Sequence, residues 1–568
     1  MPTWRLPDRI GWRDHIIGAA LGIAYVVWLL NTAPSLGFPR DEGVYFRAGE
    51  SYVRWWRLWL STPVEALKPS AIDGAWSVNS EHPPLMKTLF GVSWWFLHEQ
   101  LHVFKDATTA FRFPGMASAA LAIWTTYIFG ARAYSRSAGL VGACLLGLMP
   151  RIFFHAHLAC FDVPITGMWI LCVYIHWRAQ RERSIVLAIA TGVVFGLCLA
   201  TKHNAWMLPA ACIPHAFFVQ RKEIWAGLRS GCLSVPASVV AMVILGPLVL
   251  YALWPHLWND PLGRASAYMQ FHLNHEYYNI EFLGKNYFSP PSPKSYLPVM
   301  VLATVPTISL ALAAVGMGDR ARVGAIRLAG WLRTRVHFTQ GDGVGVDPAE
   351  TDLLLALSFA VAVGPFFLPK TPIFGGTKHW LPAYPVLAMF AGHGFTLVRQ
   401  RMHDVLGPWI ERSAGRMGRW GADAVLALSV LVGPLAVTAH SHPFGLSCYV
   451  PLVGGTAGGA SLGLNRQFWG FTTQSAAAEY LNARAPRGAT VFIHDTTWDS
   501  WARMQQEGRV RADLRAVGSP SEADFSLVQH ELHMNEVDYS AWVAVGTDAP
   551  AYVVQQDGVP IVSIYARR

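Results

Sequence analysis

Charged residues are scarce in this sequence of 568 residues. Asp, Glu, Lys and Arg together make up 14% of it, whereas apolar residues make up 52%. The apolar residues fall into runs of about 20, which is the length that a helix needs to cross a hydrocarbon core of about 30 Å. A soluble globular protein is therefore excluded. The formal charge of +9 does not indicate a nucleic acid partner, because the basic residues lie in short links between apolar runs, as they do in membrane proteins.

The sequence also has few cysteines, and it shows neither an internal repeat nor the pattern of a cleavable signal peptide. Six of the seven cysteines lie in or beside apolar runs, and their spacing indicates neither a disulfide framework nor a cysteine-based metal site. The sequence contains no internal repeat and no low-complexity tract. The apolar run 15–35 is too long for the core of a signal peptide, and no small-residue cleavage site follows it. We therefore expect this run to be the first membrane span.

The apolar runs predict a polytopic α-helical membrane protein with about 11–13 transmembrane helices. Basic links follow alternate spans and lie on the side of the N-terminus, which the positive-inside rule makes cytoplasmic. Residues 84–103 are apolar enough to span, but a crossing there would invert every later link. We place them at the outer interface or in a re-entrant element, and a twelfth crossing stays open. The expected spans lie near 15–35, 112–132, 138–154, 163–178, 185–201, 204–219, 233–254, 297–316, 352–368, 380–397 and 423–440.

Two domains are expected. Residues 1–440 form the membrane domain, with a large first outer loop at 36–111, and the more polar residues 441–568 form a small α/β domain outside the membrane. In the second domain the runs ATVFIHD, AWVAV and AYVVQQDGVPIVSIYA predict strands. Residues 473–484 predict a helix, and Asp557-Gly558 predicts the turn of a hairpin.

Ionisable side chains recur at the outer ends of the predicted spans. Such residues are expensive to keep beside a bilayer unless they have a function. We therefore expect them to face one shared site. They are Asp41, Glu42, Glu81, His82, Asp162, Lys202, His203, His272, His275, Glu276 and Lys378.

Several of these residues also have a purely structural interpretation. Asp41 and Asp162 are suited to cap the helices that follow them, because Asp is favoured at N-caps. Glu81 and His82 precede two prolines, at which a helix can begin. Lys202 ends an apolar run, from which a lysine can extend to the membrane interface. The recurrence of such residues on one side favours a functional site, but the sequence leaves both interpretations open.

Short motifs follow one another in a familiar order. The set resembles the GT-C superfamily of membrane glycosyltransferases, and within it the branch of the protein O-mannosyltransferases and the lipid A aminoarabinose transferases. The resemblance covers residues 15–480. The motifs are Arg40-Asp41-Glu42, Glu81-His82-Pro83-Pro84-Leu85, Phe111-Arg112-Phe113-Pro114, Asp162-Val163-Pro164, Thr201-Lys202, Tyr296-Leu297-Pro298, Lys378-His379-Trp380-Leu381-Pro382 and Phe468-Trp469-Gly470.

The resemblance implies inverting transfer of a sugar from a polyprenyl-phosphate carrier on the outer face of a bacterial inner membrane. The implied partners are this lipid-linked donor, an acceptor hydroxyl on a protein, lipid or glycan, and membrane lipid, with no nucleic acid. The implied cofactor is a divalent metal ion, and the sequence does not choose among Zn, Mg and Mn. The N-terminus would be cytoplasmic and the C-terminal domain periplasmic.

By position in the motifs, Asp41 would be the general base that takes the proton of the acceptor hydroxyl. Cationic groups would stabilise the anionic phosphate as it leaves. This sequence has His82 where the branch often has lysine, and Lys378 where relatives often have arginine. The other implied assignments are Glu42 and Asp162 as further catalytic acids, Glu81 with His275 or His272 as metal ligands, and His82, Lys202 and Lys378 as donor-phosphate contacts.

Two other functions stay open. A transporter, or a flippase of lipid-linked sugars, would also have about a dozen spans, but transporters often show repeats and mid-membrane ionisable residues. A non-catalytic scaffold would account for the outer domain but not for acids and bases at the span ends. Within the outer domain, His494 and Asp495 follow a strand-like run without a serine or cysteine nucleophile signature. We therefore do not expect the catalytic centre in that domain.

Overall fold

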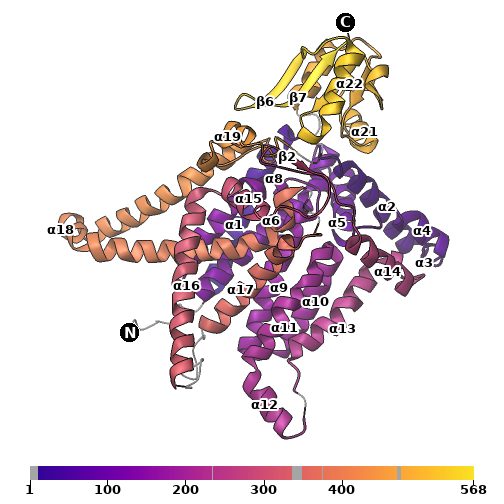
Figure 1. Cartoon of the computed structure of the whole chain (residues 1–568). Coiled ribbons are helices and arrows are strands. Elements are labelled where there is room, and N and C mark those ends of the chain that lie inside the picture. Colours follow the sequence, from indigo (N-terminus) through magenta and orange to yellow (C-terminus); the bar gives the residue numbers. More distant parts are fainter. Residues whose placement is uncertain are drawn as a thin grey trace.

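The computed structural model describes residues 10–232, 234–334, 348–371, 373, 375–467, 469 and 475–567. A body of helices carries a small sheet-containing domain at one end (Figure 1). The predicted fold class, a polytopic helical membrane protein with a small C-terminal α/β domain, is confirmed.

Each predicted span coincides with a helix. Two of the spans are bent pairs of helices, and the last two are the arms of one interrupted helix. The helices are α1 (Trp12–Thr32), α6 (Ala107–Ala133), α7 (Arg136–Gly147) with α8 (Pro150–Ala156), α9 (Asp162–Glu182), α10 (Ile185–Thr201), α11 (Leu208–Val219), α13 (Ala237–Leu253), α15 (Tyr296–Thr304) with α16 (Thr307–Thr334), α17 (Pro348–Val363) and α18 (Tyr384–Ser441).

Length and apolar composition alone identify fewer crossings than we predicted. Within the part of the chain that the structure describes, four helices meet both criteria, and the bent pairs α7–α8 and α15–α16 raise the number to six. The apolar helices α10 and α13 are shorter, with 17 residues each. The count of 11–13 crossings therefore stays a prediction. The four helices are Trp12–Ser35, Ala349–Phe367, Leu381–Arg412 and Met417–Ser441.

Large apolar side chains cover the outside of several of these helices. A water-facing helix would carry polar residues there, whereas a surface in contact with lipid requires apolar ones. We therefore take these faces as lipid-facing. Exposed examples are Ile185, Val186 and Ile189 on α10, Val243, Ile244 and Leu248 on α13, and Val425, Leu428 and Val432 on α18.

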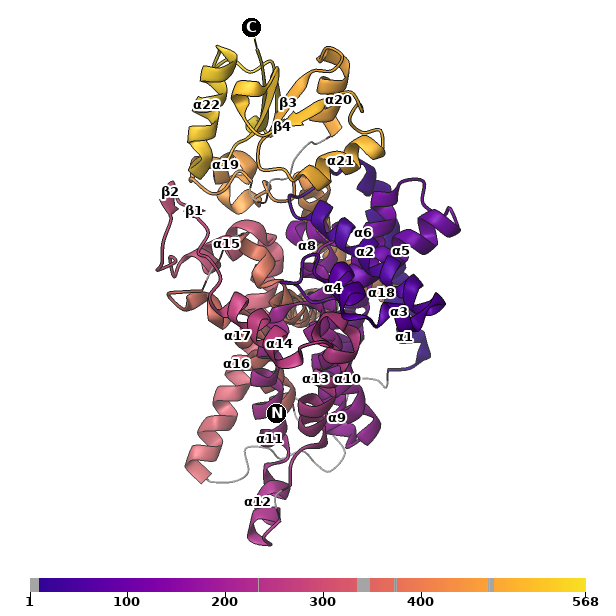
Figure 2. The same cartoon turned by 90° about the vertical axis from the view of Figure 1, so that its right-hand side faces the viewer.

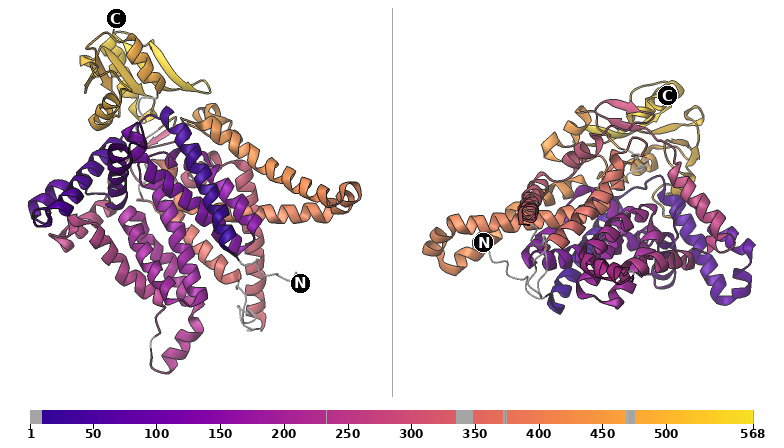
Figure 3. Two further views of the ribbon diagram at one scale, coloured as in Figure 1. Left: turned by 180° about the vertical axis from the view of Figure 1, so that it is seen from behind. Right: turned by 60° about the horizontal axis from the view of Figure 1, so that its bottom comes forward.

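Helix α18 turns back on itself at Gly415 (Figures 1 and 3). Gly415 has φ 56° and ψ −149°, a conformation that a residue with a Cβ rarely adopts. The two arms on either side of it correspond to the predicted spans 380–397 and 423–440. The first arm is largely buried in the body, whereas the second is largely exposed.

The first outer loop is mostly helical. A Cβ on Gly91 of α5 would overlap the carbonyl group of Gly49 of α2, so these two helices pack with their backbones in contact. Tyr52 stacks on Trp76 with 4.1 Å between ring centroids. The position of 84–103 at the membrane interface stays a prediction. The loop contains α2 (Glu42–Ser61), α3 (Pro63–Ala66), α4 (Pro69–Trp76), α5 (Leu85–Ser93) and the π-helical segment Trp94–Gln100.

Smaller elements connect the longer helices. Helix α14 follows α13 at the end of the body that carries the site, and a two-stranded antiparallel ribbon follows α14. These elements are α12 (Arg221–Arg229), α14 (Pro261–Leu273), β1 (Ile280–Phe282), β2 (Lys285–Tyr287) and α19 (Gly455–Ser461).

The C-terminal domain contains a five-stranded sheet in the order β4-β3-β5-β7-β6. Strand β3 is parallel to β4 and β5, and β7 is antiparallel to β5 and β6. The predicted hairpin is present, with φ of 52° at Asp557 and 76° at Gly558. The elements are α20 (Ser475–Arg484), β3 (Thr490–Ile493), α21 (Trp498–Gln506), β4 (Arg515–Val517), β5 (Phe525–Gln529), α22 (Asn535–Val545), β6 (Tyr552–Gln556) and β7 (Val559–Ala566).

One predicted strand is a helix. The run Ala541–Val545, which we expected to be extended, forms the C-terminal end of α22. Ala541 and Val545 are four residues apart, and both pack against Val528 and Tyr565 of the sheet. Residues four apart lie on one face of a helix. They would also lie on one side of a strand, so this spacing alone does not distinguish the two structures. The predicted helix at 473–484 is confirmed over the described residues, as α20.

The C-terminal domain rests on the first outer loop (Figure 2). One buried apolar cluster joins Phe38 and Phe46 of the loop to Val491 and Trp501 of the domain. A Cβ on Gly43, near the start of α2, would overlap the backbone of the domain at the start of α21. The domain is therefore in direct contact with the segment that carries Asp41 and Glu42.

Candidate active site

A cavity of about 890 Å³ lies where the first outer loop meets the ends of α9, α10 and α14. Its walls include both apolar rings and ionisable side chains. Eight of the nine predicted site residues line it, although they come from segments far apart in the sequence. They are Asp41, Glu81, His82, Asp162, Lys202, His272, His275 and Lys378. The ninth residue, Glu42, is not among the lining residues.

Asp162 and Lys202 form a buried ion pair in this cavity. The Lys202 ammonium donates to Oδ1 of Asp162 at 2.6 Å, and both side chains are less than 10% exposed. Asp162 is the first residue of α9, whereas the N-cap position before that helix is taken by Phe161. Lys202 follows the end of α10 and points inward instead of extending to the membrane interface. The structural interpretations of these two residues are therefore not supported.

Asp41 precedes α2, yet its side chain does not cap that helix. Its Oδ2 accepts a hydrogen bond from the indole N–H of Trp469, and its Oδ1 lies 3.5 Å from Nε of Arg40. The backbone N–H of Arg40 donates to the carbonyl of Trp469 at 3.0 Å. The Asp41 carboxylate is thus held from two sides and exposed to the cavity.

Lys378 lies in a 3-10 turn, Gly376–His379, and also lines the cavity. Its ammonium lies 4.1 Å from the centre of the Trp469 ring, a favourable position for a cation. Burial lowers the pKa of Lys378, although the carboxylates of Asp162 and Asp41 oppose this effect. Trp469 therefore contacts both a candidate base and a candidate phosphate-binding cation.

The loop that carries Glu81 and His82 is fixed by Lys87 of α5. The fully buried Lys87 ammonium donates to the carbonyl of Asn79 and, at 2.8 Å, to that of His82. The Glu81 carboxylate accepts from the side-chain amide of Asn79. Burial, together with the charge of Lys87, lowers the pKa of His82 well below its ordinary value. We therefore treat His82 as a neutral imidazole.

His272 reaches Glu81 from α14. Its Nε2 donates to the Glu81 carbonyl at 2.9 Å, so in the neutral ring Nδ1 carries the lone pair. The His203 ring stacks on it with 4.0 Å between centroids. Burial lowers the pKa of His272 to about 4. His275 lies in the cavity wall just beyond the end of α14, with Nδ1 2.9 Å from the carbonyl of Glu276.

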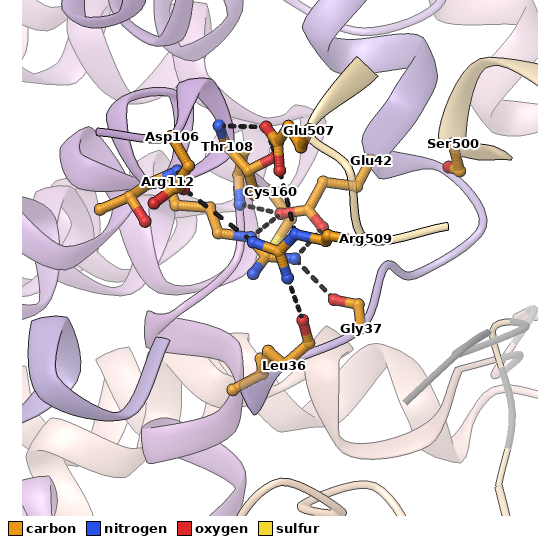
Figure 4. A network of polar contacts seen from close by, with 12 residues as sticks. Leu36, Gly37, Glu42, Asp106, Thr108, Arg112, Cys160, Ser500, Glu507 and Arg509 are labelled. Atoms are coloured by element: carbon orange, nitrogen blue, oxygen red, sulfur yellow. Dashed lines mark hydrogen bonds and ion pairs between the residues drawn. The ribbon is translucent and has the colours of Figure 1, made fainter. Parts of the chain in front are cut away.

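Glu42 has a different environment, which Figure 4 shows. It forms a buried two-point ion pair with Arg112 of α6, at 2.8 Å for Nε–Oε1 and 2.6 Å for NH2–Oε2. Its Oε1 also accepts the backbone N–H of Ala159 at 2.9 Å. Glu42 therefore joins α2, α6 and the turn before α9. Its predicted catalytic role stays a prediction.

The C-terminal domain continues this network. Glu507 accepts the N–H and hydroxyl of Thr108 at 2.7 and 2.6 Å, and Arg509 donates to the carbonyl of Leu36 at 3.1 Å (Figure 4). The guanidinium groups of Arg112 and Arg509 lie 5.2 and 5.3 Å from the centre of the Phe38 ring. These contacts fix the segment of chain that leads into Asp41.

Asp495 ties the domain to the site directly. Its Oδ1 accepts from NH1 of Arg40 at 2.9 Å, and the hydroxyl of Thr497 donates to the Arg40 carbonyl at 3.0 Å. Burial lowers the pKa of Arg40, but the charges of Asp495 and Asp41 outweigh it and the pKa is raised. The domain thus positions the residue next to the candidate base.

Four residues of this arrangement were not recognised as site residues from the sequence: Trp469, Lys87, Arg40 and Asp495. Trp469 and Arg40 belong to motifs that we quoted, so their motif context was a usable signal. Asp495 follows a strand end, where sites often form, but nothing in its spacing relates it to Arg40. Lys87 has no sequence signal, since it lies inside an apolar helix and acts through backbone carbonyls.

Comparisons with known proteins agree with this architecture. Residues 82–252 match the model of the dolichyl-phosphate-mannose-protein mannosyltransferase family. The chain is similar to the Archaeoglobus fulgidus oligosaccharyltransferase in the apo form, with 11% identity, 96% of this chain and 75% of that chain covered, and a TM-score of 0.50. A search of curated protein sequences gives no match.

Two further solved structures have lower scores. ArnT from Cupriavidus metallidurans bound to undecaprenyl phosphate has 14% identity, covers 97% of either chain and has a TM-score of 0.45. The Archaeoglobus fulgidus oligosaccharyltransferase in complex with Zn and sulfate has 12% identity, with 94% of this chain and 70% of that chain covered, and a TM-score of 0.45. The predicted resemblance to the GT-C superfamily agrees with the family match at residues 82–252, and the likeness to the oligosaccharyltransferase structure shows a shared fold.

Proposed function

We propose that this chain, which has the fold of the GT-C membrane glycosyltransferases, transfers a sugar from a polyprenyl-phosphate donor to an acceptor hydroxyl on the outer face of the membrane. The observation that carries the proposal is one cavity that holds a carboxylate, Asp41, together with the cations Lys202 and Lys378. A phosphate leaving group requires cations, and an attacking hydroxyl requires a base. The family match at 82–252 covers the segment from His82 to Lys202 and beyond.

In the proposed reaction Asp41 accepts the proton of the acceptor hydroxyl. The acceptor oxygen forms a bond to the anomeric carbon while the bond from that carbon to the phosphate oxygen breaks. The phosphate leaves on the carrier lipid, and Lys202 and Lys378 stabilise its charge. Attack from the face opposite to the leaving group inverts the anomeric configuration. Trp469 supports this division of roles, because it contacts Asp41 through its N–H and Lys378 through its ring.

Two of the predicted acids receive supporting roles in this proposal. Asp162 accepts from Lys202 at 2.6 Å and so holds the ammonium in the cavity. Glu42 is bound to Arg112 and to the Ala159 N–H, which leaves it to hold the loop that carries Asp41. Neither carboxylate then needs to touch the reacting atoms.

The predicted metal ligands fit a divalent ion poorly. Glu81, His272 and His275 line the cavity, but among the described residues they do not form a group of three whose ligand atoms lie within 4.8 Å of one another. A metal-binding role for these three residues stays a prediction. We therefore route no step of the reaction through a metal.

The topology is also proposed, with the N-terminus cytoplasmic and the C-terminal domain periplasmic in a bacterial inner membrane. The basic links between spans support it. Reporter fusions after residues 340 and 460 are expected to report opposite sides, and a cytoplasmic signal from both would contradict this topology.

The test of the function uses purified protein in lipid nanodiscs with polyprenyl-phosphate sugars and with protein, lipid A and glycan acceptors. Release of polyprenyl phosphate that requires an acceptor is the expected result. The transporter or flippase alternative predicts movement of intact lipid-linked sugar across a vesicle membrane and no release of polyprenyl phosphate. These two readouts separate the functions.

A further inference from the structure

Three buried side chains that the proposed reaction uses only in part lie together beside the cavity. They are His155 near the end of α8, Cys160 in the following turn and Asp162 at the start of α9. One ligand atom from each lies within 4.8 Å of the others. All three are less than 5% exposed, and Cys160 and Asp162 also line the cavity.

The His155 imidazole is the feature that needs an explanation. It is completely buried, and within the described part of the chain neither of its ring nitrogens has a hydrogen-bond partner. Buried polar groups are normally satisfied, because an unsatisfied one costs free energy. The nearest acid oxygen, Oδ2 of Asp162, lies 3.7 Å from Nδ1, which is too long for a hydrogen bond.

That separation suits two ligands of one metal ion. Zinc lies about 2.0–2.2 Å from nitrogen and oxygen ligands and about 2.3 Å from sulfur, so tetrahedral ligand atoms are roughly 3.3–3.8 Å apart. Asp162 can serve two partners, because its Oδ1 accepts from Lys202 while its Oδ2 faces His155. The Cys160 sulfur makes a long contact of 3.9 Å, to the His155 carbonyl.

We propose that His155, Cys160 and Asp162 form a binding site for a borderline divalent transition metal ion of the Zn²⁺ class. A nitrogen, sulfur and oxygen donor set favours Zn²⁺ or Co²⁺ over Mg²⁺ and Ca²⁺. Metal binding replaces the thiol proton of Cys160, which passes to solvent. Three protein ligands leave a fourth position, as in catalytic zinc sites.

The charges are compatible with an anionic ligand in the cavity. A divalent ion is neutralised by one thiolate and by the Asp162 carboxylate, and the Lys202 ammonium then leaves one net positive charge. Without the ion, the Lys202–Asp162 pair and a neutral thiol carry none. The ion would therefore increase attraction for a phosphate group.

The sequence had indicated a different arrangement. The cysteine spacing suggested no cysteine-based metal site, and the resemblance placed the metal on Glu81 with His272 or His275. Neither expectation includes His155, which becomes visible only when α8 and α9 bring it beside Asp162.

The experiment titrates metal-stripped, full-length protein with Co²⁺. One Co²⁺ per chain is expected to give a thiolate-to-cobalt charge-transfer absorption with the visible bands of tetrahedral cobalt, and Zn²⁺ should displace both. Cys160→Ser should abolish the charge-transfer absorption. Cys448→Ser, which changes another buried cysteine outside the cavity, should keep it.

His155→Asn provides a second variant if Cys160→Ser does not fold, and it should weaken Co²⁺ binding at least tenfold. Absence of a thiolate band in the wild type would overturn the proposal without any variant. Persistence of the band in Cys160→Ser, or binding lost in Glu81→Gln but kept in Cys160→Ser, would overturn it as well. Because these readouts are spectroscopic, they are independent of whether the chain transfers a sugar.

Discussion

Substitution of Glu42 by Gln separates the structural from the catalytic interpretation of this residue. The side chains of Glu42 and Arg112 are 2% and 1% exposed, and two short contacts join them. Neutralising Glu42 leaves the Arg112 guanidinium buried without its counter-charge. Breaking a buried ion pair in this way typically costs about 3–5 kcal/mol. We therefore expect Glu42→Gln to be a strongly destabilised protein.

The measurement is the apparent thermal unfolding midpoint in nanodiscs, compared with that of the wild type. A loss of this size should lower the midpoint by several degrees or more. The matched control is Glu182→Gln, because Glu182 forms a similar pair with Arg178 at 2.7 Å but its side chain is 41% exposed. Exposed pairs contribute at most about 1 kcal/mol, so this control should unfold near the wild-type temperature.

A double substitution tests the physical reason. Replacing both Glu42 and Arg112 by Met removes the two charges together, which is often far less costly than removing one. The double variant should therefore be more stable than Glu42→Gln. If Glu42→Gln unfolds like the wild type but has lost transfer activity, the structural interpretation is refuted and the catalytic role predicted from the sequence is restored.

Three other predictions concern the cavity. Asp495→Asn removes the charge that holds Arg40 and should lower kcat by roughly tenfold, which corresponds to the loss of one charge-assisted contact of about 1.5 kcal/mol. The control is Asp513→Asn, which changes an ion pair with Arg511 on the surface of the C-terminal domain and should leave kcat unchanged. Burial lowers the pKa of Lys378, so the charge of its ammonium, and with it the activity, should be lost as the pH rises toward that lowered pKa. Lys378→Arg should keep the activity to higher pH, which a rate measurement at alkaline pH checks. Trp469→Phe keeps the ring under the cation but loses the indole N–H, so kcat should fall with little change in the donor KM; an unchanged kcat would contradict the positioning role.

The positions of the helices follow from the sequence because apolar length is a local property. Every expected span coincides with a helix, and the hairpin at Asp557-Gly558 is present. The error at Ala541–Val545 has a local cause, since a short apolar run fits a strand or a buried helix equally well. The sharp turn at Gly415 depends on one glycine in a basic link, where no pattern distinguishes a turn from a loop.

The candidate site follows from the sequence only in part. Eight residues that line one cavity could be predicted because ionisable side chains recur at the outer ends of the spans. The partner of each residue was not predictable, because pairs such as Arg40 with Asp495 or Glu42 with Arg112 join segments that only tertiary packing brings together. For the same reason the sequence could not separate Asp41, which faces the cavity, from its neighbour Glu42, which does not.

The most direct test of the central claim is the transfer rate of Asp41→Asn. Asn is nearly the same size, and the structure shows no capping hydrogen bond that the change would remove, so the variant should fold and insert normally. An amide cannot take the acceptor proton, and loss of a positioned general base typically lowers the rate by about 10²–10⁴. Release of polyprenyl phosphate in the presence of acceptor should fall by that factor at unchanged protein stability. A variant that keeps more than about a tenth of the wild-type rate, well above that loss, would contradict the assignment of Asp41 as the base.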